Sequence, residues 1–410
     1  MDAISVDDIL HSAQELLAAR FGGRQKLSDP EDLGGSGESV VLRFRLATNP
    51  FLPERSVVVK QLPTAATTGF EPALLREIVS YQFTNTLPED TRPGPTLLAH
   101  DVEHRLLVLS DIGEAETYDE LLAPKTTTDE RTQALRALAN ALARTHTATA
   151  MREEGFHALM SRLFHRHHLD PAIAGARDRG VVRSIDKGLK ILHSRGIAVT
   201  EDVQQLANLA ARRTNSGNHR AFTPFDLRPD NILVRNRVFF LDYEWAGFRD
   251  VAFDLAAVVA GFPHYPFTEP LSDDEASFFV ETWQGAVKHM WPDIIGDDEL
   301  HERITIALLG WVLLSVTLLH FGGAEDALAA EGYLERRIEH GELSDPGAIY
   351  VPPDHRDGVE WTASSAAERK DLIRTAKVLR RFAESCSERF ADCVPLADAV
   401  VAMVSDHRGS

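Results

Sequence analysis

The stretch from Ala221 to Trp245, AFTPFDLRPDNILVRNRVFFLDYEW, constrains this chain more than any other. Its pattern predicts a short extended run, a polar loop and then a hairpin. Asp226 and Asn231 lie five residues apart in the loop, and Asp242 ends the second hairpin strand. An acid, an amide and a second acid in this order favour phosphoryl transfer from a metal–nucleotide complex. In such a transfer, one residue would act as a base or orient the attacking hydroxyl, and two would supply oxygen ligands to Mg²⁺.

The composition is that of a globular chain with an acidic balance. Its 410 residues are 44% hydrophobic and 26% charged. This length predicts about two or three domains. The formal net charge of −19 argues against nucleic acid and anionic membranes as partners, because both bind Lys/Arg patches. A cationic substrate is compatible with this acidity, although solubility explains it equally well.

Cysteine usage and the N-terminus favour a cytoplasmic location. The chain has two cysteines, Cys386 and Cys393, which show neither metal-ligand spacing nor a disulfide framework. The N-terminus, MDAISVDDIL, carries acids where a secretion signal has bases. The apolar run Ile304–Phe321 contains polar residues such as Thr305 and His320, and no basic cluster follows it. We therefore expect a buried core helix there rather than a membrane span.

The N-terminal part contains three signals that are weak individually. The turn Leu33–Ser39, LGGSGES, has glycines that allow backbone N–H groups to approach phosphates. An ordinary hairpin turn is also compatible, because no Gly-Lys-Ser/Thr follows and Val40 replaces the third glycine of G-x-G-x-x-G. The strand Ser56–Lys60 ends in a lysine, and Glu77 flanks the apolar stripe of a helix over residues 71–85. Both charges are either solvated or paired with each other.

The predicted secondary structure changes from mainly strands to mainly helices near Gly113. Strands are expected at Thr96–His100 and Arg105–Ser110, and the second ends in a short polar connector. Residues from about 25 to 112 are β-rich, and the remainder has helical periodicity. The spacing Thr127 to Glu130 is that of a capping box, which predicts a helix start. The Pro/Gly-rich segment 345–362 is expected to be a lid or a disordered loop.

Taken in chain order, these motifs resemble the aminoglycoside phosphotransferase/choline kinase group of the protein-kinase-like fold. They are the glycine-rich turn, the strand lysine, the helix glutamate and the stretch from Ala221 to Trp245. The stretch FDLRPDNILV…FLDYEWAGFRDVAFDLA is similar to that group's signature H-G-D-L-H-P-x-N-I-L…I-D-W-E…D-x-A-x-D-L-A. The resemblance spans about residues 30–262. It implies an α+β, two-lobed fold, with a β-rich nucleotide-binding lobe over residues 1–112. A mostly helical lobe over 113–410 would hold the catalytic loop and the acceptor subdomain.

The resemblance also implies roles for individual residues. Asp226 would be the catalytic residue, and Asn231 and Asp242 would ligate Mg²⁺. Lys60 would hold the α- and β-phosphates of ATP and pair with Glu77, while Asp254 would support the loop structurally. The implied nucleotide-binding residues are Gly34, Gly35, Ser36, Gly37, Ser39, Lys60, Glu77, Ser110 and Ile112.

Three positions depart from the group's pattern. Pro224 stands where the signature has His, Phe225 where it has Gly, and Arg228 where it often has His. Since the base and both metal ligands remain, we interpret these changes as altered loop support rather than lost chemistry.

The leading hypothesis is an ATP- and Mg²⁺-dependent kinase. It would act on a hydroxyl of a small molecule such as an aminoglycoside, an amino alcohol or a sugar-like metabolite. The main alternative is a catalytically weak or silent nucleotide-binding protein with a regulatory role, which Pro224 favours. A third hypothesis keeps the fold but transfers phosphate to a protein or uses another nucleotidyl chemistry. Against a protein substrate, no D-F-G, A-P-E or activation-loop pattern follows Asp242.

Overall fold

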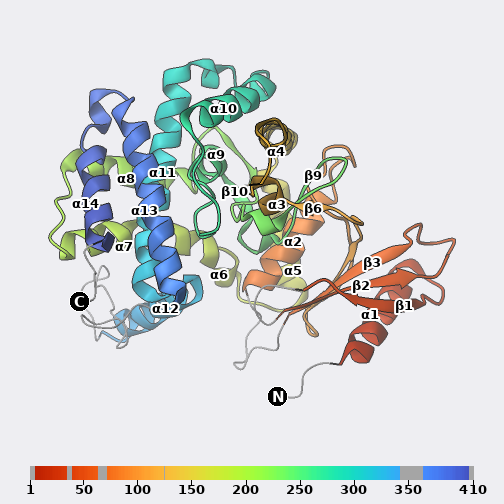
Figure 1. Cartoon of the computed structure of the whole chain (residues 1–410). Coiled ribbons are helices and arrows are strands. Elements are labelled where there is room, and N and C mark those ends of the chain that lie inside the picture. The colour runs from red at the N-terminus through yellow and green to blue at the C-terminus, as the bar shows by residue number, and fades with distance from the viewer. Residues whose placement is uncertain (1–4, 35–38, 63–71, 124, 342–362, 406–410) are drawn as a thin grey trace. The chain divides into compact units, whose positions relative to one another are not determined.

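A computed structural model describes residues 5–34, 39–62, 72–123, 125–341 and 363–405 (Figure 1). Contacts divide the chain into two compact units, each built from segments far apart in sequence. Unit 1 comprises residues 1–116, 152–174 and 233–246. Unit 2 comprises residues 117–151, 175–232 and 247–410. These units are defined by their internal contacts and do not test a boundary between lobes. The predicted lobe boundary at residues 112–113 therefore stays a prediction. The predicted loop 345–362 lies outside the described residues.

Unit 1 contains a five-stranded antiparallel sheet of order β1-β2-β3-β5-β4. Its helices are α1, α2, α5 and α6, and the hairpin β8–β9 also belongs mainly to this unit. The bounds are α1 Val6–Phe21, β1 Leu27–Asp32, β2 Val40–Leu46, β3 Ser56–Gln61, α2 Pro72–Thr84, β4 Leu97–Asp101, β5 Leu106–Ser110, α5 Glu153–Arg166, α6 Pro171–Ala174, β8 Ile232–Val234, β9 Val238–Phe240 and the 3₁₀ turn η2 Tyr243–Trp245.

The core of this sheet explains which way its side chains face. Ile9, Ala13 and Leu17 of α1 share a buried cluster with Val57 and Val59 of β3. Successive side chains of a strand point to opposite faces. Lys60 therefore points away from α1. The strand that carries the lysine is fixed by its apolar neighbours, and the lysine faces the side to which α2 contributes Glu77.

Unit 2 is mostly helical, which together with unit 1 confirms the predicted α+β class. The long helix α11 packs against α7, α8, α9 and α13, and two short strands, β7 and β10, pair antiparallel. The bounds are β6 Glu116–Thr117, α3 Tyr118–Leu122, α4 Thr128–Thr149, α7 Ala176–Ser194, α8 Glu201–Arg213, β7 Arg220–Thr223, η1 Pro229–Asn231, β10 Gly247–Asp250, α9 Ala252–Val259, α10 Asp273–Val287, η3 Pro292–Ile295, α11 Asp297–Phe321, α12 Ala324–Glu339, α13 Ala363–Glu384, η5 Glu388–Phe390 and α14 Cys393–Ser405.

The apolar helix α11 is a core helix, as the sequence predicted. By length and composition it is the one helix among the described residues that is long and apolar enough to cross a membrane. However, 89% of its apolar window is buried inside the protein. Trp311 of this helix donates its Nε1–H to the carbonyl of Phe253 at 2.9 Å, which satisfies the polar atom of a buried indole.

Side-chain caps begin two of the helices, and the sequence predicted the cap of α4. The Ser5 side chain accepts the N–H of Asp8 at the start of α1. Thr127 and Glu130 form the predicted capping box before α4. These contacts satisfy N–H groups that have no partner inside the helix.

Candidate active site

The centre of the site in unit 1 is a lysine held between two carboxylates. Lys60 Nζ lies 2.9 Å and 3.0 Å from the two carboxylate oxygens of Glu77, and 2.7 Å from Oδ1 of Asp242. The Glu77 side chain is 1% exposed, whereas those of Lys60 and Asp242 are 14% and 19% exposed. The ion pair between Lys60 and Glu77 that the resemblance implied is therefore present, and it has a third member.

Burial and charge oppose each other within this cluster. Burial alone lowers the pKa of Lys60, but the negative charges of Glu77 and Asp242 outweigh that effect and raise the pKa above its usual value. Burial raises the pKa of Glu77 to about 7, although Lys60 counteracts part of this increase. Near neutral pH the lysine is thus a fixed cation.

Asp242 has a left-handed backbone, with φ 56° and ψ 69°. Aspartate enters this region more readily than most residues other than glycine, but local contacts still have to hold it there. The end of β9 is held because Phe240 N–H donates to the carbonyl of Pro93 at 2.8 Å. After Asp242, the ring of Tyr243 lies 4.8 Å from that of Tyr81, and Arg76 donates to the carbonyl of Ala246. Contacts with α2 and with the segment before β4 therefore hold the hairpin in position.

Gly94, in the segment before β4, lies directly against Phe240 and Tyr243 of this region. A Cβ added at Gly94 would meet the carbonyl oxygen of Phe240 and the hydroxyl of Tyr243, each at 2.6 Å. Since no heavy atom fits at that distance, only glycine allows the segment to approach Asp242 this closely. The sequence analysis did not identify Gly94, although the Pro-Gly-Pro run around it is a turn signal.

The predicted nucleotide-contacting backbone is only partly described. Gly35, Ser36 and Gly37 lie outside the described residues, while Gly34 has φ 77° and donates its N–H to Asp32 Oδ1 at 2.9 Å. At the end of β5, the Ser110 hydroxyl accepts from the N–H of Thr96. The carbonyl of Ile112 accepts from Arg235 Nη1 at 2.7 Å.

The loop in unit 2 carries the other two predicted residues. It continues β7 into Pro224 and ends with Asn231 in η1. Asp226 N–H donates to the Pro224 carbonyl at 2.8 Å, and Arg228 Nε lies 3.3 Å from Asp226 Oδ1. The Asn231 side chain is nearly buried, and no residue in the described parts of the chain accepts from its Nδ2. The amide is thus not fixed through that atom.

Phe225 shows how the chain accommodates one departure from the signature. Its φ is 66°, a left-handed conformation that suits the glycine of the signature better than a residue with a Cβ. The Phe225 ring stacks on Trp311 at 4.7 Å, and the guanidinium of Arg249 lies 4.3 Å from the ring centroid. Aromatic and cation–π packing therefore holds a backbone conformation that glycine would adopt without support.

Asp254 has a partner that the sequence analysis missed. Its Oδ2 lies 3.1 Å from His146 Nε2, and Trp283 Nε1 donates to His146 Nδ1 at 3.1 Å. All three side chains are buried and come from α9, α4 and α10. The capping-box helix and the Asp254 signature were both visible in the sequence, but nothing local indicated that they meet.

Comparisons with known proteins give matches to solved structures at low sequence identity. No family model and no curated protein matches the chain. Among solved structures, choline kinase LicA from Streptococcus pneumoniae is 13% identical with a TM-score of 0.45, over 90% of this chain and 98% of that one. Choline kinase from Cryptosporidium parvum is 12% identical with a TM-score of 0.45, over 83% and 98%. Macrolide 2'-phosphotransferase MphH from Brachybacterium faecium is 16% identical with a TM-score of 0.41, over 78% and 96%. Two of these structures are choline kinases and the third is a phosphotransferase.

Proposed function

We propose that the protein transfers the γ-phosphate of ATP to a hydroxyl group of a small molecule. Lys60 would bind the α- and β-phosphates, with Glu77 as its partner, and the backbone of Gly34–Ser39 would cover the phosphates. Backbone groups at Ser110 and Ile112 would contact the adenine. Asp226 would orient the acceptor hydroxyl and take its proton. The transition state is strongly anionic, so a fixed cation beside the phosphates lowers its energy.

The observation that carries this proposal is the Lys60–Glu77–Asp242 cluster. The three residues come from β3, α2 and the end of the β8–β9 hairpin, and Lys60 and Asp242 are 182 positions apart. A solvated surface lysine does not need two buried or half-buried carboxylates. A phosphate-binding lysine does, because the carboxylates keep it charged and oriented before the substrate arrives.

The residues present fit a magnesium ion. Mg²⁺ takes oxygen ligands and is usually held by one or two protein groups together with substrate phosphates. Asp242 has one carboxylate oxygen on Lys60 and a second that is free of that contact, and Asn231 has an amide oxygen, the kind of ligand that Mg²⁺ takes. Asn231 and Asp242 would each supply an oxygen to the ion. When bound, the ion would neutralise charge on the phosphates.

Asp226 does not need a strongly raised pKa for its role. In phosphoryl transfer with a loose transition state, the hydroxyl proton leaves late, so orientation matters more than basicity. The hydrogen bond from Asp226 N–H to Pro224 and the nearby guanidinium of Arg228 restrict the carboxylate's position.

Purified protein incubated with Mg-ATP and a panel of hydroxylated metabolites tests the proposal. The panel should include amino alcohols, aminoglycosides and sugars, and the readout is acceptor-dependent release of ADP. The alternative is a silent nucleotide-binding protein, which Pro224 and the left-handed Phe225 favour because both alter the loop around Asp226. Tight ATP binding without turnover on any acceptor supports that alternative and overturns the kinase proposal.

A further inference from the structure

Helix α2 of unit 1 supports both ends of the turn η2, which follows Asp242. Asp242 is the residue before the turn, and Ala246 is the residue after it. At the first end, Asp242 Oδ1 lies 2.7 Å from Lys60 Nζ, which is also paired with Glu77 of α2. At the second end, Arg76 Nη1 donates to the carbonyl of Ala246 at 3.2 Å. Two neighbouring residues of one helix therefore act on opposite ends of the same turn.

Arg76 also bonds to a third segment of unit 1. Its Nη2 donates to the carbonyl of Ala174, the last residue of α6, at 3.1 Å. Its guanidinium lies 6.0 Å from the ring centroid of Phe156 in α5, and the residue is 3% exposed. The carbonyls at the end of a helix have no partner inside the helix, so this bond satisfies one of them. Arg76 thus connects α2 to segments 98 and 170 positions further along the chain.

The two bonds depend on the shape of a guanidinium group. The terminal nitrogens of arginine lie in one plane and point in fixed directions, so one side chain can donate to two carbonyls at once. A lysine carries a single nitrogen on a flexible chain and does not reproduce this pair. Because both partners are backbone atoms, Arg76 restricts the path of the chain after Asp242.

The backbone of Asp242 makes this restriction relevant to its carboxylate. Its φ of 56° lies in the left-handed region, where local contacts have to hold the residue. Between the two ends of the turn, the ring of Tyr243 lies 4.8 Å from that of Tyr81, which also belongs to α2. The turn is only three residues long, so a shift at Ala246 would change the direction of the Asp242 carboxylate.

We propose that Arg76 is a positioning residue for the magnesium ligand Asp242. It acts through the Ala246 carbonyl and couples the position of α2 to that of the turn. The inference rests on the proposed function, in which Asp242 supplies an oxygen to Mg²⁺. Groups that orient a metal ligand without touching the metal commonly contribute about tenfold to a hundredfold to metal affinity.

Calorimetric titration of the full-length protein with ATP, once with Mg²⁺ and once with EDTA, tests the proposal. The measured quantity is the ratio of the two affinities, which is the enhancement by Mg²⁺. In Arg76→Lys we expect this enhancement to be about tenfold smaller than in the wild type. The affinity for ATP in EDTA should stay nearly the same, because Lys60 and Glu77 are retained. A purely structural role would weaken both affinities together.

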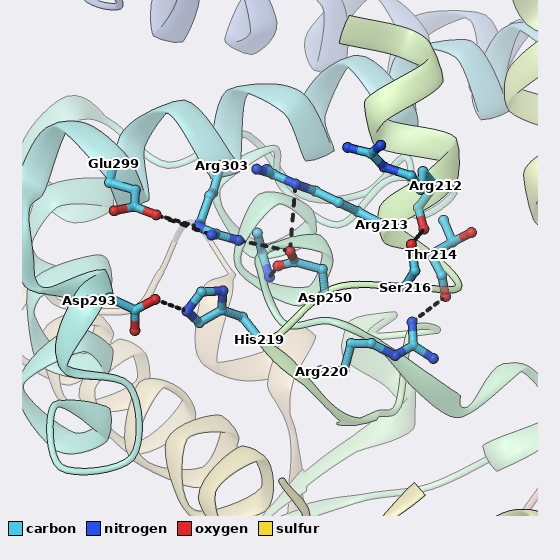
Figure 2. Close-up of polar contacts among 11 residues, drawn as sticks. Arg212, Arg213, Thr214, Ser216, His219, Arg220, Asp250, Asp293, Glu299 and Arg303 are labelled. Carbon is cyan, nitrogen blue, oxygen red and sulfur yellow. Dashed lines mark hydrogen bonds and ion pairs between the residues drawn. The ribbon is translucent and has the colours of Figure 1, made fainter. Parts of the chain in front are cut away.

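Arg220 of unit 2 provides a matched control. It also donates to two backbone carbonyls, that of Thr214 at 3.0 Å and that of Phe248 at 2.7 Å. Figure 2 shows its bond to Thr214. Arg220→Lys removes the same kind of paired contact away from Asp242, so it should retain the enhancement by Mg²⁺.

A second variant, Ala246→Gly, leaves α2 unchanged and keeps the proposal testable if Arg76→Lys does not fold. Glycine gives the backbone more freedom at the end of the turn, so the enhancement by Mg²⁺ should fall here too. Equal enhancement in the wild type and both variants overturns the proposal, as does an equal loss of ATP affinity with and without Mg²⁺. Wild-type protein that binds no ATP overturns the proposed function, and this inference with it.

Discussion

The Lys60 cluster of unit 1 and the Asp226 loop of unit 2 were predicted from the same resemblance, but different interactions hold their geometry. Around Lys60, the expected residue types are all present and their opposite charges hold them together. Around Asp226, the expected acid and amide are present, but the backbone conformation depends on the packing of Phe225 against Trp311 and Arg249. A cluster of ion pairs loses its interactions when one charged member is replaced. A loop conformation, in contrast, can be held by different packing contacts.

The largest effect is expected from Asp226→Asn. The amide replaces one acceptor oxygen by an N–H donor, so it can neither orient the acceptor hydroxyl as the carboxylate does nor take its proton. Phosphate transfer should therefore slow by a factor on the order of 10²–10⁴. ATP affinity should not change, because Asp226 is assigned to the acceptor. Rapid-quench transfer assays and nucleotide titrations separate the two. Unchanged transfer in this variant would remove Asp226 from the mechanism.

Lys60→Met tests whether charge pairing holds the first region. Removing the cation leaves the Glu77 and Asp242 carboxylates facing each other, with Glu77 fully buried. We expect a loss of about 3 kcal/mol in the free energy of unfolding, because a buried carboxylate without its partner is costly. Lys26→Met removes an exposed lysine of the same unit and should be nearly neutral. Equal urea midpoints for the two variants would show that the cluster does not stabilise the fold.

Phe225 tests the packing account of the second region. Phe225→Ala should reduce stability by about 3 kcal/mol, because the stacked ring is lost. Phe225→Gly loses the same ring but relieves the left-handed strain, so it should be more stable than the alanine variant by about 1 kcal/mol. If glycine is no better than alanine in chemical unfolding, the backbone strain at φ 66° is not a real cost.

Gly94→Ala should disturb the first region through the backbone. The added Cβ would meet Phe240 and Tyr243 at 2.6 Å, so the segment that carries Asp242 must shift. We expect a loss of about 1–3 kcal/mol in the free energy of unfolding. The control is Gly155→Ala in α5 of the same unit, where a Cβ meets no atom within 4 Å. It should be neutral or slightly stabilising, and a matching loss there would point to a general effect of the substitution.

The last expected effect is a pH dependence from Glu77. Its pKa in the folded protein, about 7, lies above the ordinary value of 4.5, so the folded state binds the extra proton. The associated stabilisation is present below pH 4.5 and is lost as the pH rises through about 7. As the pH rises from 5 to 8, the free energy of unfolding of the wild type should therefore fall relative to that of Glu77→Gln. A constant difference would exclude titration of Glu77 in this range.

Much of the fold and part of the site could be predicted, because the deciding signals were local. The capping residues Ser5 and Thr127 act within three positions of themselves, and the apolar stripe of α2 needs only helical periodicity. The left-handed Asp242 and the close approach of Gly94 were not predictable. They depend on contacts across more than a hundred residues, which no local pattern encodes. The His146–Asp254–Trp283 network was missed for the same reason.

The central claim is tested most directly by identifying the product. Phosphorus-31 NMR of the wild-type protein with Mg-ATP and each acceptor should show a new phosphate monoester that forms in step with ADP. The resonance should be absent without acceptor or without Mg²⁺. ADP accompanied only by inorganic phosphate, or bound ATP that no acceptor consumes, would contradict the assignment of the Lys60 cluster and the Asp226 loop to phosphoryl transfer.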